Sequence, residues 1–270
     1  MKFIGLDLAW AAHNPSGGAV VTLDGTGGRL TDVTLLGDDV DVLAFIDSHL
    51  PVGVGGIVAV DAPLRVPNAS GSRVAERELA RVFGRFQAGA HPANRALVGD
   101  ASGNVRGEVL IAALQERDFV LDPFLAARQQ TRRVVEVFPH PAMVSLFGLS
   151  RTLKYKNKGQ GRAALLSEWA ALHGHLRALA SADPPLHGLD ALLATEVTAL
   201  RGRGLKNHED QVDAVVCGYV ALYAWTWGTA RTEVFGSVEG GHILTPTLAE
   251  RWAQASQGAS EGGHAGLDPF

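Results

Sequence analysis

The stretch GIVAVDAP, residues 56–63, decides the fold class of the chain. It is a continuous apolar run of strand length that ends at Asp61, the pattern of a strand buried on both faces of a parallel sheet. The segment before it has a helical pattern, with Asp38 placed to cap the first turn and an apolar stripe that includes Val42 and Ile46. A strand–helix–strand order implies a right-handed crossover that returns the second strand to the same sheet. The sequence therefore predicts an α/β domain.

Further strands complete the predicted sheet. Residues 1–8 form an apolar strand, and residues 18–23 and 29–36 follow it as an antiparallel meander joined by glycine-rich turns. Residues 133–138, RVVEVF, are β-branched and apolar and form the last strand. We expect a mixed five-stranded sheet flanked by helices, with a helical insertion before the last strand.

The rest of the chain is predicted to be mainly helical. A single domain is expected over residues 1–250, because no change in composition marks a boundary. A terminal hairpin is expected around Gly240, and residues 256–270, which are small and polar, are expected to be disordered. The expected helices after the last strand span residues 142–147, 162–180, 189–201 and 209–227, and the hairpin spans residues 232–245.

Composition narrows the classes of function. The chain has 270 residues, of which 46% are hydrophobic, enough to bury a sizeable core, and a net charge of −4. A protein that coats long duplex nucleic acid is usually basic, so any nucleic-acid contact is expected to be local, or the substrate small. No apolar run reaches the roughly 18 residues that a membrane span needs. Cys217 is the only cysteine, so no disulfide forms within the chain, which suits a reducing cytoplasm.

Several carboxylates are expected to meet at one edge of this sheet. Asp7 ends the first strand, Asp61 ends the fourth, and Glu136 lies within the fifth. Asp210 and Asp213 are three residues apart in the last long helix, so they share a face. The carboxyl ends of parallel strands are where open α/β sheets build their sites. Crowded carboxylates repel one another, and two Mg²⁺ or Mn²⁺ ions would offset that repulsion and support phosphodiester hydrolysis.

The order of elements and acids resembles the ribonuclease H superfamily. In that superfamily an Asp on the first strand, an acid after the fourth strand and acids on a later helix hold two Mg²⁺ ions. Six phrases run in order along the chain: GLDLAW (5–10), VDAPL (60–64), RVAEREL (73–79), EVFPHP (136–141), KYK (154–156) and HEDQVDAVVCGYVAL (208–222). In these phrases the chain more closely resembles a family of unknown function that is usually described as predicted ribonuclease-H-like nucleases. This resemblance implies a ribonuclease-H-like fold and a metal site.

Each acid also has an ordinary structural explanation. Asp7 could cap a turn, and Asp61 could fix a loop. Glu136 is harder to explain in this way, because an unpaired acid buried within a strand is costly unless an arginine such as Arg73 neutralises it. Taken together, on elements that converge, the acids favour a metal site. Its predicted catalytic residues are Asp7, Asp61, Glu136 and Asp213, and its predicted metal ligands are these four with Asp210.

Four further residues are candidates for substrate binding. Arg73 belongs to a basic stripe on a helix that could equally be a solvated face. Lys154 and Lys156 flank Tyr155 in a glycine-rich loop, which could hold phosphates and stack a base or could simply be solvated. His208 precedes the acidic turn and is the best candidate for a general acid.

The leading hypothesis is a divalent-metal-dependent nuclease or phosphodiesterase acting on nucleic acid or a nucleotide. One alternative is an ATP-dependent phosphotransferase of the actin-like fold, which shares this strand order and also places an Asp on its first strand. Another is a catalytically silent scaffold that binds nucleic acid. The sequence leaves the substrate and the oligomeric state open.

Overall fold

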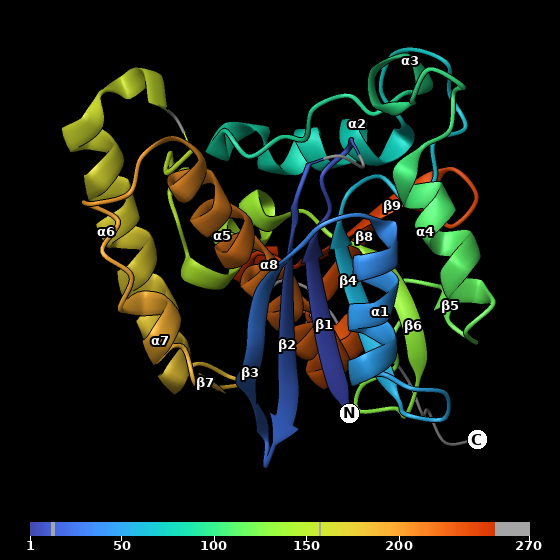
Figure 1. Ribbon diagram of the computed structural model, residues 1–270, viewed down its shortest axis with the longest axis horizontal. Coiled ribbons are helices and arrows are strands. Elements are labelled where there is room, and N and C mark those ends of the chain that lie inside the picture. The colour runs from blue at the N-terminus through green and yellow to red at the C-terminus, as the bar shows by residue number, and fades with distance from the viewer. Residues whose placement is uncertain (12–13, 157, 252–270) are drawn as a thin grey trace, which may run out of the picture.

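A computed structural model describes residues 1–11, 14–156 and 158–251. Its centre is a mixed sheet with helices on both faces, and a separate antiparallel hairpin packs beside it (Figure 1). The expected tail at 256–270 lies outside the described residues. The strands of the sheet are β1 (Lys2–Asp7), β2 (Ser16–Asp24), β3 (Gly27–Leu36), β4 (Gly56–Asp61), β5 (Val120–Leu121), β6 (Arg132–Glu136) and β7 (Leu186–His187), and the hairpin is β8 (Thr232–Ser237) with β9 (Gly241–Pro246).

The helices differ from the expectation at four places. A short helix forms at residues 95–98, where none was predicted, and the helix expected over residues 142–147 begins at Pro139. The segment 189–201 contains only a short helix at its start, and the last helix begins at Gly202 rather than at Glu209. Asp210 and Asp213 therefore lie inside this helix and not in its first turn. The helices are α1 (Asp39–His49), α2 (Val74–Phe83), α3 (Arg95–Val98), α4 (Arg106–Gln115), α5 (Pro139–Phe147), α6 (Arg162–Ala178), α7 (Asp190–Leu193) and α8 (Gly202–Trp227).

The sheet confirms the α/β class and corrects the strand number. Its order is β5-β6-β4-β1-β2-β3-β7, with β1 parallel to β4 and antiparallel to β2. All five expected strands are present in the described structure. The sheet has seven strands rather than five because the two-residue strands β5 and β7 pair at its two edges. The expected hairpin is confirmed as β8 and β9.

Two hydrophobic layers cover the faces of the sheet. Alternate residues of β1 point to opposite faces, so Phe3 packs in the core beneath α8, whereas Ile4 and Leu6 pack in the core beneath α1 and α4. Asp38 caps α1 by accepting from the backbone N–H groups of Val40 and Asp41, as the sequence predicts. Figure 1 shows α1 in front of the sheet and α8 behind it. Among the described residues, no helix is both long and apolar enough to cross a membrane.

Helix α8 lies unusually close to β1 and β2, because two glycines face it. A Cβ atom added at Gly5 would lie 1.9 Å from the carbonyl oxygen of Ala214, and one added at Gly17 would lie 2.0 Å from that of Asp210. The helix backbone thus packs directly on the strand backbones. This close contact determines how near the acidic residues of α8 lie to the carboxyl end of β1.

We predict that Gly5→Ala destabilises the protein by roughly 3 kcal/mol or more, because its methyl group would have to displace helix backbone. Gly174→Ala is the matched control. Gly174 is exposed in α6 with no neighbouring atom near its added Cβ, so this change should stabilise the protein by about 0.5–1 kcal/mol. Urea unfolding of both variants measures the difference. Equal stability of Gly5→Ala and wild type would contradict the close packing of α8.

Candidate functional site

Two aspartates lie side by side at the carboxyl edge of the sheet. In the parallel pair of β1 and β4, Asp7 is the register partner of Asp61. Side chains at paired positions of neighbouring strands point to the same face, which here is the face covered by α8. Both side chains are half-buried. The sequence prediction that these two acids meet is confirmed by this register.

Helix α8 adds a third aspartate to this pair. Asp213 has no exposed side-chain surface, and its charge acts on both Asp7 and Asp61. We call Asp7, Asp61 and Asp213 the aspartate cluster. Asp210 lies at its margin, where it acts on Asp7 and forms an ion pair with Lys206 one helical turn away.

A loop before α6 places a cation against the cluster. The Lys156 ammonium group forms an ion pair with Asp213 Oδ2, and the Tyr155 hydroxyl donates a hydrogen bond to Asp213 Oδ1. Tyr155 is fully buried, and its ring packs edge-on against Trp169 with the ring centroids 5.3 Å apart. The loop is therefore anchored by its aromatic residue, which corrects the alternative of a simply solvated loop.

Ionisation of the aspartate cluster is unfavourable, because its carboxylates are desolvated and repel one another. Desolvation raises the pKa of Asp7 well above its ordinary value, and the charges of Asp213 and Asp61 raise it further. Desolvation likewise raises the pKa of Asp61 to about 7, although Lys156 opposes this rise. Desolvation alone would lower the pKa of Lys156, but Asp213 and its neighbours raise it above the ordinary value. Lys156 is therefore held as a cation, and Asp61 exchanges its proton near neutral pH.

The structure does not bring Glu136 into the cluster. Glu136 is the register partner of Val60, so its side chain lies on the opposite face from that of Asp61. Its carboxylate accepts two hydrogen bonds from Arg73, at 2.5 and 2.9 Å, and one from the backbone N–H of Leu64 at 2.9 Å. Arg73 also binds Glu76, and all three side chains are buried. Glu136 and Arg73 therefore form a buried ion pair, and the charge of Glu136 still acts on Asp61; the catalytic and substrate-binding roles of these two residues stay predictions.

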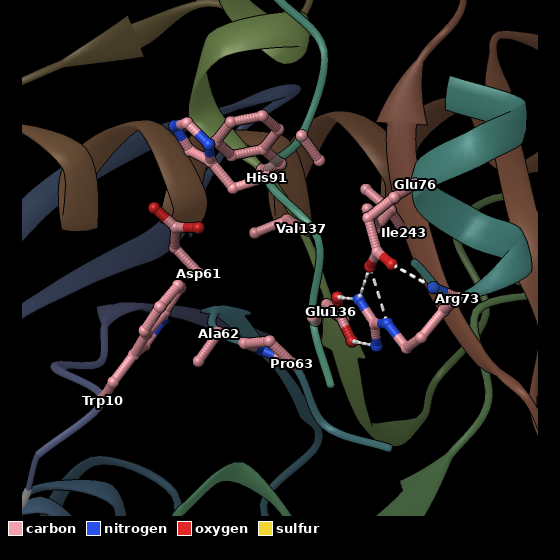
Figure 2. A pocket seen from close by; sticks show the side chains of 13 residues that line it. Trp10, Asp61, Ala62, Pro63, Arg73, Glu76, His91, Glu136, Val137 and Ile243 are labelled. Atoms are coloured by element: carbon pink, nitrogen blue, oxygen red, sulfur yellow. Dashed lines mark hydrogen bonds and ion pairs between the residues drawn. The ribbon is translucent and has the colours of Figure 1, made fainter. Parts of the chain in front are cut away.

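A cavity of about 90 Å³ lies between the cluster and this ion pair. Figure 2 shows Trp10, Asp61 and His91 on one side of it, and Arg73 with its two glutamates on the other. The Trp10 side chain is 51% exposed. An aromatic ring and a carboxylate with a pKa of about 7 thus border a space that a substrate can reach.

A larger cavity of about 460 Å³ lies on the other side of His91 and Phe138, which line both spaces. We call it the lysine cavity. Lys154 and Lys156, both half-buried, are in its wall. The predicted substrate contacts Lys154 and Lys156 thus lie together beside the aspartate cluster. The lysine cavity is defined by His91, Phe138, His140, Thr152, Lys154 and Lys156.

His208 lies apart from these cavities. Its ring stacks on Trp169, with the centroids 5.1 Å apart, and contacts His173. Desolvation lowers the pKa of His208 to about 4, so it is neutral at pH 7. His208 is therefore buried among aromatic rings, and its predicted role as a general acid stays a prediction.

The carboxylate oxygens of the aspartate cluster are ligands of the type that a hard cation prefers, but they do not surround a single position. Carboxylate oxygens are the preferred ligands of Mg²⁺ and Mn²⁺. Within the described parts of the chain, no group of three or more His, Cys, Asp or Glu side chains has an arrangement that could hold a metal ion. Lys156 supplies the positive charge at Asp213 instead.

Sequence reasoning missed four features of this site. The Tyr155 hydroxyl bond to Asp213 and the place of His91 between the two cavities depend on tertiary contacts that no local pattern encodes. Trp10 had a local signal, because it follows the Asp7 strand directly. The pairing of Lys206 with Asp210 was also readable, since helical residues four apart are neighbours.

We predict that Asp61→Asn flattens the pH dependence of stability. The pKa of Asp61 is about 7 in the native state and about 4 in an unfolded chain, so native protein binds this proton more tightly. The free energy of unfolding should therefore fall as pH rises from about 4 to about 7. Asp61→Asn should lose this fall and be more stable than wild type by roughly 1–3 kcal/mol above pH 7. Urea unfolding in EDTA tests this, with Asp24→Asn, which removes an exposed partner of Arg29, as control. A wild-type pH slope in Asp61→Asn would overturn the prediction.

A second prediction separates Glu136 from the cluster. Glu136→Gln should lower the free energy of unfolding by roughly 3 kcal/mol, because it removes one partner of a buried ion pair. Glu233→Gln, which breaks the exposed pair with Arg251, should cost less than about 1 kcal/mol. Chemical unfolding compares the two variants. If Glu136→Gln were as stable as wild type, the structural role assigned to Glu136 would be wrong.

The comparisons with known proteins identify a family whose function is unknown. A family model described as "Protein of unknown function (DUF429)" matches residues 5–236, a range that contains the aspartate cluster and the lysine cavity. No curated protein and no solved structure matches the chain. Because the family model matches well over half of its length, the chain belongs to the DUF429 family of proteins of unknown function.

Proposed function

We propose that this chain is a ribonuclease-H-like phosphodiester hydrolase of the cytoplasm that acts on nucleic acid or a nucleotide with the help of a divalent cation. The observation that carries the proposal is the meeting of Asp7, Asp61 and Asp213, which come from adjacent parallel strands and the helix packed on them. Three carboxylates in a partly desolvated place, two of them with a raised pKa, have a surplus of negative charge that a cation would offset.

The proposal requires at most one Mg²⁺ or Mn²⁺ ion, and the three aspartates would have to move together to bind it, because in the described residues they are not arranged around a common point. Asp7, Asp61 and Asp213 would hold it, whereas Glu136 is engaged by Arg73, and Asp210 is paired with Lys206. Binding at Asp213 would require Lys156 to leave its ion pair. A bound divalent cation supplies Lewis-acid activation of water and stabilises negative charge on a leaving oxygen.

The chain's own groups have defined roles in this proposal. Asp61, with a pKa of about 7 in the site without a cation, would lose its proton when it binds the cation, so cation binding should become stronger as the pH rises through neutrality. The Tyr155 hydroxyl fixes the orientation of the Asp213 carboxylate. Lys156, once free of Asp213, is placed to neutralise a phosphate oxygen.

A second candidate, a catalytically silent scaffold that binds nucleic acid, has one observation in its favour. The ion pair of Lys156 with Asp213 already balances part of the charge for which a metal would be needed. A scaffold of this kind would bind its ligand without any requirement for a cation.

The prediction that tests the proposal is loss of cleavage in Asp7→Asn. This change keeps the shape of the side chain and removes its charge, so Mn²⁺-dependent cleavage should fall by at least about a hundredfold while the fold is retained. Labelled single-stranded, duplex, hybrid and branched substrates are incubated with wild type, Asp7→Asn and Glu239→Gln. Glu239 is exposed in the β8–β9 turn, so its variant should cleave like wild type.

Three outcomes would reject the proposal. Cleavage that survives in Asp7→Asn would mean another active site. Release of phosphate from ATP without nucleic-acid cleavage would favour a phosphotransferase or ATPase. Equal nucleic-acid binding by wild type and Asp7→Asn, with no cleavage by either, would favour the scaffold.

A further inference from the structure

Two lysines, Lys154 and Lys156, line the lysine cavity, although the chain has a net charge of −4. His140 lies in its wall, and desolvation together with the charge of Lys156 lowers the pKa of His140 to about 4. Lys154 and His91 lower that pKa further, whereas Asp213 opposes them. His140 is therefore neutral, and Lys154 and Lys156 are the lysines whose charges act on it. A cavity lined by two lysines attracts an anion.

The same walls provide neutral hydrogen-bonding and aromatic groups. The Thr152 hydroxyl lies 3.0 Å from His140 Nδ1, and the rings of Phe138 and His140 meet edge to face with the centroids 5.5 Å apart. Thr152 and His140 can bond a sugar or phosphate oxygen, and the half-buried Phe138 ring gives a flat apolar surface. The combination matches a ligand that joins a phosphate to an aromatic group.

The size of the cavity also limits the ligand. Its volume of about 460 Å³ lies within the range of roughly 300–1,000 Å³ of small-molecule sites. A long duplex would instead need an extended basic surface. Of the basic stripe Arg73, Arg77, Arg81 and Arg85, only Arg77 and Arg81 are left for such a surface, because Arg73 is buried with Glu136 and Arg85 pairs with Glu250.

Lys156 connects the cavity to the aspartate cluster. Its side chain lines the cavity and its ammonium group contacts Asp213. A phosphate held by Lys154 and Lys156 would therefore lie next to the carboxylates, and His91 and Phe138 stand between this space and the one beside Asp61.

We propose that the lysine cavity binds a single nucleotide unit, with its phosphate at Lys154 and Lys156 and its base against Phe138. This inference rests on the proposed function, because it names the substrate that would reach the aspartate cluster. The unit can be a free nucleoside monophosphate or the phosphorylated end of a strand, and both present the same phosphate and base to the cavity.

Calorimetric titration without metal tests this binding separately from catalysis. Wild type is titrated with the four nucleoside 5′-monophosphates, the matching nucleosides, inorganic phosphate, and oligonucleotides with and without a 5′-phosphate. At least one nucleotide should bind roughly tenfold or more tightly than its nucleoside or phosphate alone, because each half adds contacts. If an oligonucleotide displaces the mononucleotide only when it carries a 5′-phosphate, the natural ligand is the phosphorylated end of a strand. If no oligonucleotide displaces it, the natural ligand is the free nucleotide.

Variants localise the binding. Lys154→Ala should weaken nucleotide binding about tenfold through loss of a charge-assisted contact. His91→Ala, at an exposed position, should weaken it as well and is expected to fold normally. Lys2→Ala is the matched control, since Lys2 is at the opposite end of β1 from Asp7. Unfolding temperatures check that each variant is folded.

The inference fails if no nucleotide binds at about 1 mM, if Lys2→Ala and Lys154→Ala lose the same affinity, or if affinity grows with strand length and is indifferent to Lys154. Such a failure together with Asp7-dependent cleavage would leave the proposed function standing. Nucleotide binding that depends on Lys154, without any cleavage, would reject the proposed function and support the inference.

Discussion

The direct contact between the backbone of α8 and the backbones of β1 and β2 is the constraint on which the rest of the structure depends. Gly5 and Gly17 leave no side chain between helix and strands, since added Cβ atoms would lie 1.9 and 2.0 Å from helix carbonyl oxygens. A helix held away by ordinary side chains could bury its apolar face equally well. A helix held farther from the strands could not bring the carboxylate of Asp213 next to that of Asp7. The glycines therefore create the site as well as the packing.

This close packing brings three aspartates together, and a lysine partly offsets the repulsion among them. Bringing Asp213 to Asp7 and Asp61 in a partly desolvated place raises the pKa of both strand aspartates. Lys156 offsets part of that charge, and its position depends on Tyr155, which is buried against Trp169. The packing of Tyr155 against Trp169 thus fixes the position of the loop that carries Lys156. The ammonium group of Lys156 in turn reduces the electrostatic repulsion within the aspartate cluster.

The predictable parts of the fold and site are those that local patterns determine. The five longer strands follow from apolar runs and turns, and the meeting of Asp7 with Asp61 follows from their places at the ends of parallel strands. Strands β5 and β7 have two residues each, too few to show periodicity. The start of α8 was misplaced because Glu209 and Asp210 resemble a helix N-terminus, whereas the helix begins at Gly202. Glu136 could not be assigned because its face depends on register, and a shift of one residue moves a side chain to the other face.

The separation of acids and lysines across the site bears on how an anionic substrate could approach it. Without a cation, the aspartate cluster would repel a phosphate, and Lys156 and Lys206 moderate that repulsion. The lysine cavity lies beside the cluster, and its wall holds Lys154 and the neutral His140. In the proposed function, a phosphate would be bound by the lysines, and the bond to be broken would lie beside the carboxylates. If Lys156 turns from Asp213 to the phosphate, the same movement frees a ligand for a divalent cation. Substrate binding and cation binding would then favour each other through one side chain.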